Sequence, residues 1–136
     1  MQRTKSRRLV LSGSLLEPEI GFARAVQVGA PVAISGTAPI AADGTATVGR
    51  DVYVQTKRCL EIIEQAITSL RGSFTDIIRT WVLLTDIRKW KEAARAHGER
   101  FSDIRPAFTF VQVSGFIDPE WHVEVEADTI ISTDAA

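Results

Sequence analysis

Apolar residues recur every three or four positions between Asp51 and Arg71, which is the spacing of an amphipathic helix with one buried face. The positions on this face are Val52, Thr56, Cys59, Leu60, Ile63, Ala66, Ile67 and Leu70. Asp51 suits the positive N-terminal end of a helix, and Gly72 suits a left-handed exit after its last turn. The pattern predicts a helix over residues 51–71, with Cys59 as a buried, inert packing thiol.

Most of the remaining hydrophobic pattern is typical of short strands, because it alternates with a period of two or is rich in β-branched and aromatic residues. The predicted strands cover residues 22–28, 32–35, 77–84, 108–113 and 122–131, with a further strand near Leu9 to Leu11. Gly29-Ala30 predicts the turn between the first two, and Asp118-Pro119 predicts the turn before the last.

A second helix is predicted after the strand at 77–84, with Asp86 as its cap. Its inner face would carry Trp90, Ala93, Ala94, His97 and Phe101. On such a face His97 is expected to be a hydrogen-bonded packing residue. Residues 36–50 show no periodicity, so this long loop is either functional or a surface excursion.

The order of elements, β-β-β-α-β-α-β-β, predicts an α+β fold with a single sheet of about six strands and two helices on one face. The other face then needs cover, which oligomerisation supplies most simply. We expect an N-terminal extension over residues 1–20, one domain over 21–131 and a C-terminal tail over 132–136.

Composition narrows the function classes. The 136 residues carry a net charge of -1, which gives no general attraction to nucleic acid or to an anionic membrane, so we expect neither as a partner. The chain has one cysteine and therefore no internal disulfide, which fits the cytoplasm. It lacks both an apolar run of about 18 residues and the apolar segment of a signal peptide.

The last predicted strand carries the densest set of polar groups. Alternation places His122, Glu124, Glu126 and Asp128 on one face of it. Three carboxylates beside an imidazole suit a metal or acid–base chemistry, whereas a half-exposed strand shows the same alternation by default. No glycine-rich phosphate loop or zinc-ligand spacing occurs, so no cofactor and no metal are expected.

Two motifs add to this picture, namely Arg-Pro-Ala-Phe-Thr-Phe-Val at 105–111 and His-Val-Glu-Val-Glu at 122–126. With landmarks such as Ser35-Gly36, Pro39 and Gln55 in the same order and spacing, they resemble the RidA family, also called YjgF or L-PSP endoribonuclease-like, over about residues 21–131. The resemblance implies a chorismate-mutase-like fold, a homotrimer with clefts between subunits, and hydrolysis of reactive enamines or imines.

The resemblance also implies site residues. Glu124 and Ser35 match the catalytic glutamate and the substrate-orienting serine of the deaminating branch, while Phe22 stands where that branch has a tyrosine. Phe108 stands where it has the arginine that clamps a substrate carboxylate. Arg105 is a further candidate substrate-binding residue, and its other interpretation is a surface or subunit-interface ion pair.

Three functions remain open. The first is an imine or enamine hydrolase with a changed substrate range, and the second is a non-catalytic trimer that binds a small apolar metabolite. The third, a ribonuclease or translation inhibitor, is least supported because no basic-aromatic pattern appears. Loss of the arginine fork should weaken carboxylate binding by about 10–100-fold, unless Arg105 or Arg24 replaces the cation.

Overall fold

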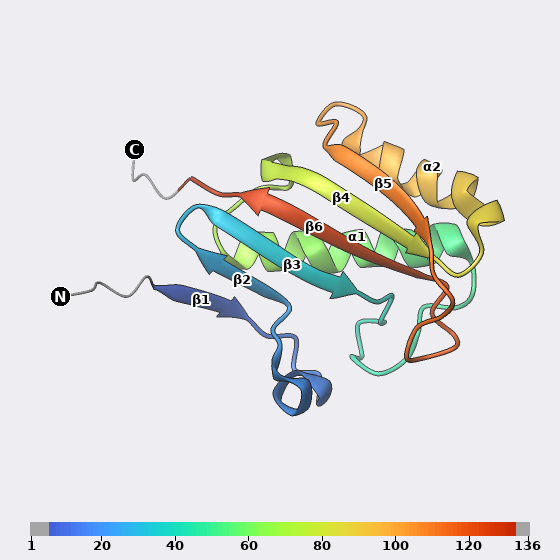
Figure 1. Cartoon of the computed structure of the whole chain (residues 1–136), viewed down its shortest axis with the longest axis horizontal. Coiled ribbons are helices and arrows are strands. Elements are labelled where there is room, and N and C mark those ends of the chain that lie inside the picture. Colours follow the sequence, from blue (N-terminus) through green and yellow to red (C-terminus); the bar gives the residue numbers. More distant parts are fainter. Residues whose placement is uncertain (1–5, 133–136) are drawn as a thin grey trace.

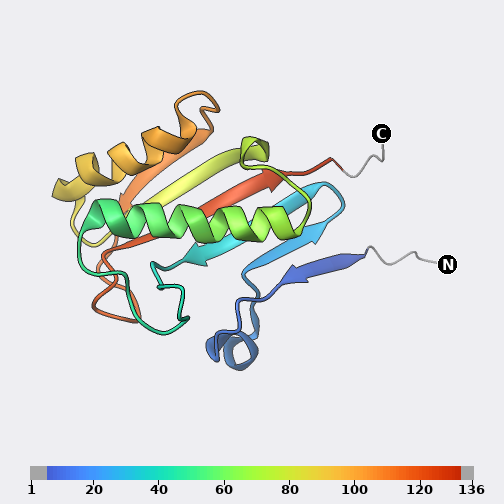
Figure 2. The ribbon, with the colours of Figure 1, turned by 180° about the vertical axis from the view of Figure 1, so that it is seen from behind.

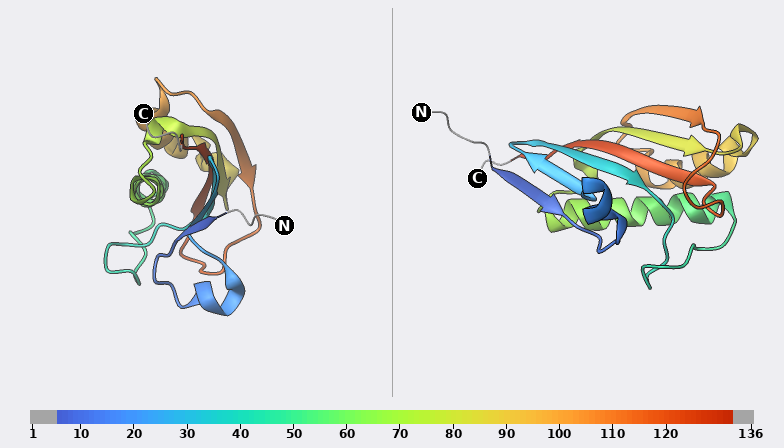
Figure 3. Two further views of the ribbon diagram at one scale, coloured as in Figure 1. Left: turned by 90° about the vertical axis from the view of Figure 1, so that its left-hand side faces the viewer. Right: turned by 60° about the horizontal axis from the view of Figure 1, so that its bottom comes forward.

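A computed structural model describes residues 6–132 of the chain. They form one six-stranded sheet with both long helices on the same face (Figures 1 and 2). This confirms the predicted α+β arrangement and its order of elements. The left panel of Figure 3 shows the sheet from its end, with α1 packed on one side of it.

The strands are β1 (Arg7–Val10), β2 (Ala25–Val28), β3 (Pro31–Thr37), β4 (Ile77–Leu84), β5 (Ala107–Gln112) and β6 (Val123–Ile130). Their order in the sheet is β1-β2-β3-β6-β4-β5. Only β4 and β5 pair in parallel, because α2 connects them as a crossover. β1 and β5 are therefore the two edges, and β1 belongs to the segment that was expected as an N-terminal extension.

Helix α1 (Val52–Ser69) begins where the sequence predicts, because the side chain of Asp51 accepts a hydrogen bond from the Val54 backbone N–H at 2.9 Å. All eight positions of the predicted apolar face are buried, which confirms that face. Cys59 is fully buried, as expected.

The end of α1 differs from the prediction. The left-handed residue is Arg71, at φ 66°, and not Gly72. The absence of a side chain at Gly72 serves packing instead, because a Cβ there would clash with the side chains of Ile131 and Ile67. The expected left-handed exit at Gly72 is wrong for this reason. The chain continues through a short turn, η2 (Phe74–Asp76), into β4.

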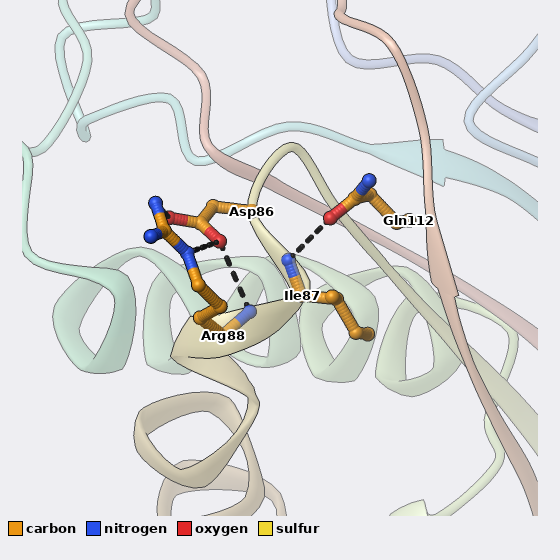
Figure 4. Close-up of polar contacts among 4 residues, drawn as sticks. All are labelled: Asp86, Ile87, Arg88 and Gln112. Atoms are coloured by element: carbon orange, nitrogen blue, oxygen red, sulfur yellow. Dashed lines mark hydrogen bonds and ion pairs between the residues drawn. The ribbon is translucent and has the colours of Figure 1, made fainter.

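Helix α2 (Trp90–Phe101) is preceded by another short turn, η3 (Ile87–Lys89). Asp86 caps η3 rather than α2, since its carboxylate accepts from the Arg88 N–H and also pairs with the Arg88 guanidinium, both at 3.0 Å (Figure 4). The Gln112 side chain accepts from the Ile87 N–H at 2.8 Å and so ties the end of β5 to this turn (Figure 4).

The inner face of α2 is only partly as predicted. Ala93 and Phe101 are buried, and Ala94 and His97 are half-buried. Trp90 is 43% exposed, so its placement in the core was wrong. Its ring lies over Phe110 at the edge of the sheet, where no further layer covers it.

The face of the sheet opposite the helices is open. Apolar side chains such as Leu9 on β1 and Val111 on β5 are 54% and 39% exposed. Exposed apolar residues on a sheet face are typical of a surface that another molecule covers. No helix within residues 6–132 has the length and apolar character to cross a membrane.

Candidate functional site

The central strand β6 separates its side chains as the sequence predicts. Its helix-facing residues, Val123, Val125, Ala127 and Thr129, are buried. The polar row on the open face is half-buried. Within this row Glu124 lies opposite Leu83 of β4, and on its other side it approaches the end of β3.

Gly36 leaves room for the Glu124 carboxylate against β3. The pairing of β3 with β6 shifts between Ile34 and Thr37, so the backbone is irregular at this point. A Cβ on Gly36 would lie 2.7 Å from Oε1 of Glu124. The missing side chain thus creates the space that the carboxylate occupies.

The electrostatics of Glu124 follow from this location. Burial raises the pKa of its carboxyl group, Arg24 nearby lowers it and Glu126 raises it further. Within residues 6–132 no hydrogen bond or ion pair to this carboxylate was found. Glu124 is therefore a half-buried acceptor that is open to a water molecule or to a ligand.

Phe22 and Ser35 line a hollow on the same open face, about 700 Å³ in volume, between β1–β3 and the helical turn η1 (Glu17–Gly21). Leu9, Leu11, Leu15 and Val26 make most of its remaining wall apolar. The Ser35 hydroxyl donates to the Ala23 carbonyl at 2.6 Å. With its proton engaged in this way, Ser35 Oγ can still accept a hydrogen bond from a ligand.

Phe108 lies elsewhere. Its ring is on the helix-facing side of β5, with the centroids of His97 and Phe110 at 4.5 and 4.6 Å. It is 36% exposed at the edge of the sheet. The strand register places Val111, not Phe108, level with Glu124. Phe108 and Glu124 are thus on opposite faces within one chain, and their meeting in one pocket stays a prediction about neighbouring subunits.

Similarity to known proteins shows which family the chain belongs to. The family model described as endoribonuclease L-PSP matches residues 13–131. The chain belongs to the RidA (YjgF) family. A Streptomyces coelicolor protein, SCO2049, is 39% identical over 121 residues, which are 89% of this chain and 90% of the relative.

Solved structures of the RidA family superpose closely on the chain. Rv2704 of Mycobacterium tuberculosis, described as a member of the YjgF/YER057c/UK114 family, is 36% identical, with a TM-score of 0.84 over 93% of this chain and 100% of its own. YyfA of Yersinia pestis, described as a Rid protein, has a TM-score of 0.83 over 93% of this chain and 100% of its own. At 22% identity YyfA supports the fold alone.

The two candidate replacements for the missing RidA arginine lie in different places. Arg105 is exposed, with a left-handed backbone at φ 56°, just before β5. Arg24 is half-buried at the irregular end of β3, where its Nη1 donates to the Gly36 carbonyl at 2.7 Å. Only Arg24 lies beside Glu124, and the sequence alone gave no signal of this because the two residues are 100 positions apart.

His97 was interpreted as a hydrogen-bonded packing residue, and the structure confirms this. Its Nε2 lies 2.8 Å from Oγ1 of Thr80, and its ring packs on Phe101 and Phe108. Burial lowers its pKa to about 4, so it is neutral near pH 7.

The polar row on β6 does not form a metal-binding cluster with other side chains of the described residues. Residues 6–132 contain no group of three or more His, Cys, Asp or Glu side chains that could hold a metal ion. Alternate residues along one strand lie about 7 Å apart, so the side chains of the row do not converge on one point.

Proposed function

We propose that the protein is a cytoplasmic homotrimer of the RidA type that hydrolyses an uncharged imine or enamine in a cleft between subunits. The observation that carries this proposal is the half-buried Glu124 carboxylate, which makes no hydrogen bond within residues 6–132 and lies against Gly36, the residue that follows Ser35. A carboxylate with a raised pKa is a suitable general base for a water molecule.

In the proposed reaction, the Glu124 carboxylate takes a proton from water as the water oxygen attacks the carbon of the C=N bond. Ser35 Oγ accepts a hydrogen bond from the imine N–H and so orients it. Glu124 passes the proton that it took from water to the nitrogen, which gives a neutral carbinolamine and restores the carboxylate. The C–N bond then breaks as the carbinolamine hydroxyl proton moves to the departing nitrogen, and the products are a carbonyl compound and an amine or ammonia. Every atom comes from the substrate and one water molecule.

Phe108 determines the expected substrate class. Its ring offers no hydrogen-bond donor, so a substrate carboxylate beside it would lose hydration without gaining a partner. In the proposed trimer the β5 edge of one subunit meets the open face of the next, which brings Phe108 to Phe22, Ser35 and Glu124. The two rings would then form an apolar wall that favours a flat, uncharged ligand.

Light scattering tests the assembly. We expect a stable trimer at micromolar concentration, because the open face carries exposed apolar side chains that need cover. A stable monomer would contradict the proposal. A crystal structure of the assembly in which Phe108 and Glu124 are nowhere closer than about 12 Å, beyond the span of one small ligand, would also overturn the shared cleft.

The substrate class is tested by comparing imines with and without a carboxylate. We expect release of the carbonyl product from neutral imines, and slow or absent pyruvate release from 2-aminoacrylate generated in situ by a dehydratase. Glu124→Gln should abolish the first activity. Pyruvate release as fast as that of an arginine-bearing relative would contradict the role given to Phe108.

Phe108→Arg sharpens this test, with Phe108→Leu as the matched control. The arginine should improve the kcat/KM for carboxylate-bearing imines by about 10-fold or more, because a charge-assisted fork is restored. The leucine variant removes the ring without adding a cation, so it should leave that preference unchanged.

A non-catalytic trimer that binds a small apolar metabolite is the second candidate, and Phe108 is the observation that favours it. In that case neutral ligands would bind with the same affinity to the wild type and to Glu124→Gln, and neither protein would turn over an imine.

A further inference from the structure

Arg24 lies beside the proposed site, and the RidA resemblance gives it no role. Its Nη1 donates to the Gly36 carbonyl at 2.7 Å and to Oγ1 of Thr37 at 3.0 Å. The Thr37 hydroxyl in turn donates to the Ser35 carbonyl at 2.8 Å. One nitrogen of the guanidinium is therefore fixed at the point where the pairing of β3 with β6 is irregular.

Gly36 connects Arg24 to Glu124. The guanidinium holds the carbonyl of this residue, while the Glu124 carboxylate occupies the space that its side chain would take. Cation and carboxylate thus flank the same backbone unit without a hydrogen bond between them. If Arg24 moved, the Gly36 carbonyl would lose this hydrogen bond, and the backbone beside the Glu124 carboxylate would be less constrained.

The charges around Arg24 distinguish two possible roles, a receptor for a substrate anion or a fixed counter-cation. Its guanidinium interacts with two carboxylates, those of Glu17 and Glu124. Glu17 is buried and cannot move away, because it accepts hydrogen bonds from the Ser12 and Gly13 backbone N–H groups and from the Ser12 hydroxyl. The cation thus already interacts with two carboxylates of the chain itself, which favours the role of a fixed counter-cation.

We propose that Arg24 is a positioning residue that holds the Gly36 backbone against Glu124 and places a cation beside its carboxylate. The inference rests on the proposed role of Glu124 as the base of the site. It also deepens the proposed substrate class, because a cation that interacts with two carboxylates of the chain itself is less available to an acidic substrate.

The other titratable groups near Glu124 do not replace Arg24. Glu126 on β6 and His122, just before this strand, flank Glu124, and Glu126 raises the pKa of Glu124. Behind the sheet, burial raises the pKa of the Cys59 thiol, which therefore stays neutral near pH 7. Burial itself also raises the pKa of Glu124, so Arg24 is the group that opposes both effects.

The pKa of Glu124 can be measured directly, without any substrate, by following its side-chain carboxyl resonance in ¹³C-labelled protein as a function of pH. Arg24→Gln and Arg24→Met should each raise this pKa by about one unit or more, because an opposite charge in close range is removed. Arg24→Lys should restore at least half of the difference, because it retains the charge.

Arg79→Gln is the matched control. Arg79 also lies on the open face, but in the strand register it lies opposite Asp128. Asp128 is four residues, or about 13 Å, along β6 from Glu124. Its removal should leave the pKa of Glu124 unchanged. An unchanged pKa in both neutral Arg24 variants, or an equal shift in Arg79→Gln, would overturn the proposal. Loss of folding in both neutral variants, with Arg24→Lys folded, would assign Arg24 to stability instead.

This outcome is separable from that of the proposed function. A shifted pKa without imine hydrolysis in any variant would retain the role of Arg24 and remove the reaction. If the protein does hydrolyse neutral imines, the acidic limb of the kcat/KM profile of Arg24→Gln should move upward by the same amount as the pKa. Hydrolysis with an unmoved profile would remove the role of Arg24 alone.

Discussion

Glu124 and His97 are both half-buried ionisable side chains, but they lie on opposite faces of the sheet and are treated differently. Beside β3, Glu124 has a cation, Arg24, that opposes the effect of burial. Beneath α2, His97 has only the Thr80 hydroxyl and the rings of Phe101 and Phe108, and burial alone lowers its pKa to about 4. One environment places a cation beside the ionisable group, and the other offers only neutral partners.

This difference makes Glu124 a candidate for acid–base chemistry and His97 a residue that stabilises the fold. A carboxylate that stays ionised and open to solvent can act as a base. A neutral imidazole that is fixed by one hydrogen bond and two rings stabilises the contact between α2 and the edge of the sheet. The two groups should therefore respond in opposite directions to pH and to substitution.

Removal of the Thr80 hydroxyl should have the largest effect on stability. Thr80 is fully buried, and its Oγ1 is the hydrogen-bond partner of His97 Nε2. Thr80→Val keeps the shape but leaves that nitrogen unpaired, so we expect the free energy of unfolding to fall by about 1–3 kcal/mol in urea titrations at pH 7.5. Thr80→Ser keeps the hydroxyl and should lose less than half as much. Equal losses in the two variants would show that the hydrogen bond is not what matters.

The second-largest effect should come from His97 and should appear in the pH dependence of the free energy of unfolding. Because the folded-state pKa of this base is depressed, its contribution is present above pH of about 6.5 and is lost as the pH falls towards 4. After allowance for partial exposure, the loss should be about 1–2 kcal/mol between those values. His97→Gln should flatten this part of the profile. A variant as acid-sensitive as the wild type would contradict the assignment.

Glu124 should have the smallest effect on stability, and the pH dependence of its contribution should have the opposite sign to that of His97. A carboxyl group with a raised folded-state pKa contributes stability that is present at low pH and is lost as the pH rises through that pKa. Glu124→Gln should therefore raise the midpoint of thermal unfolding at pH 7.5 by about 1–3 °C, and the gain should vanish near pH 4. The exposed Glu120→Gln is the control for loss of a surface charge and should show neither change. A lower midpoint for Glu124→Gln at pH 7.5 would mean that its charge stabilises the fold.

Local periodicity determined much of the fold. The eight apolar positions of α1 and the alternation on β6 follow directly from repeats of 3.6 and two residues, which any helix or strand with one buried face must show. The capping position of Asp51 could also be predicted, since a cap depends on a few neighbouring residues. The reason for the glycine at position 72 could not, because it lies in the packing of Ile67 and Ile131 against that position.

The candidate site depended on long-range contacts that no local pattern records. Alternation places Phe108 and Phe110 on one face of β5, but only the parallel pairing with β4 turns that face towards α2 and His97. The approach of Glu124 to Gly36 and Arg24 likewise arises from the pairing of β3 with β6 and its irregular register. The sequence by itself thus determined which residues share a face. The tertiary structure decided which groups meet, because strand order and register bring together residues about 100 positions apart.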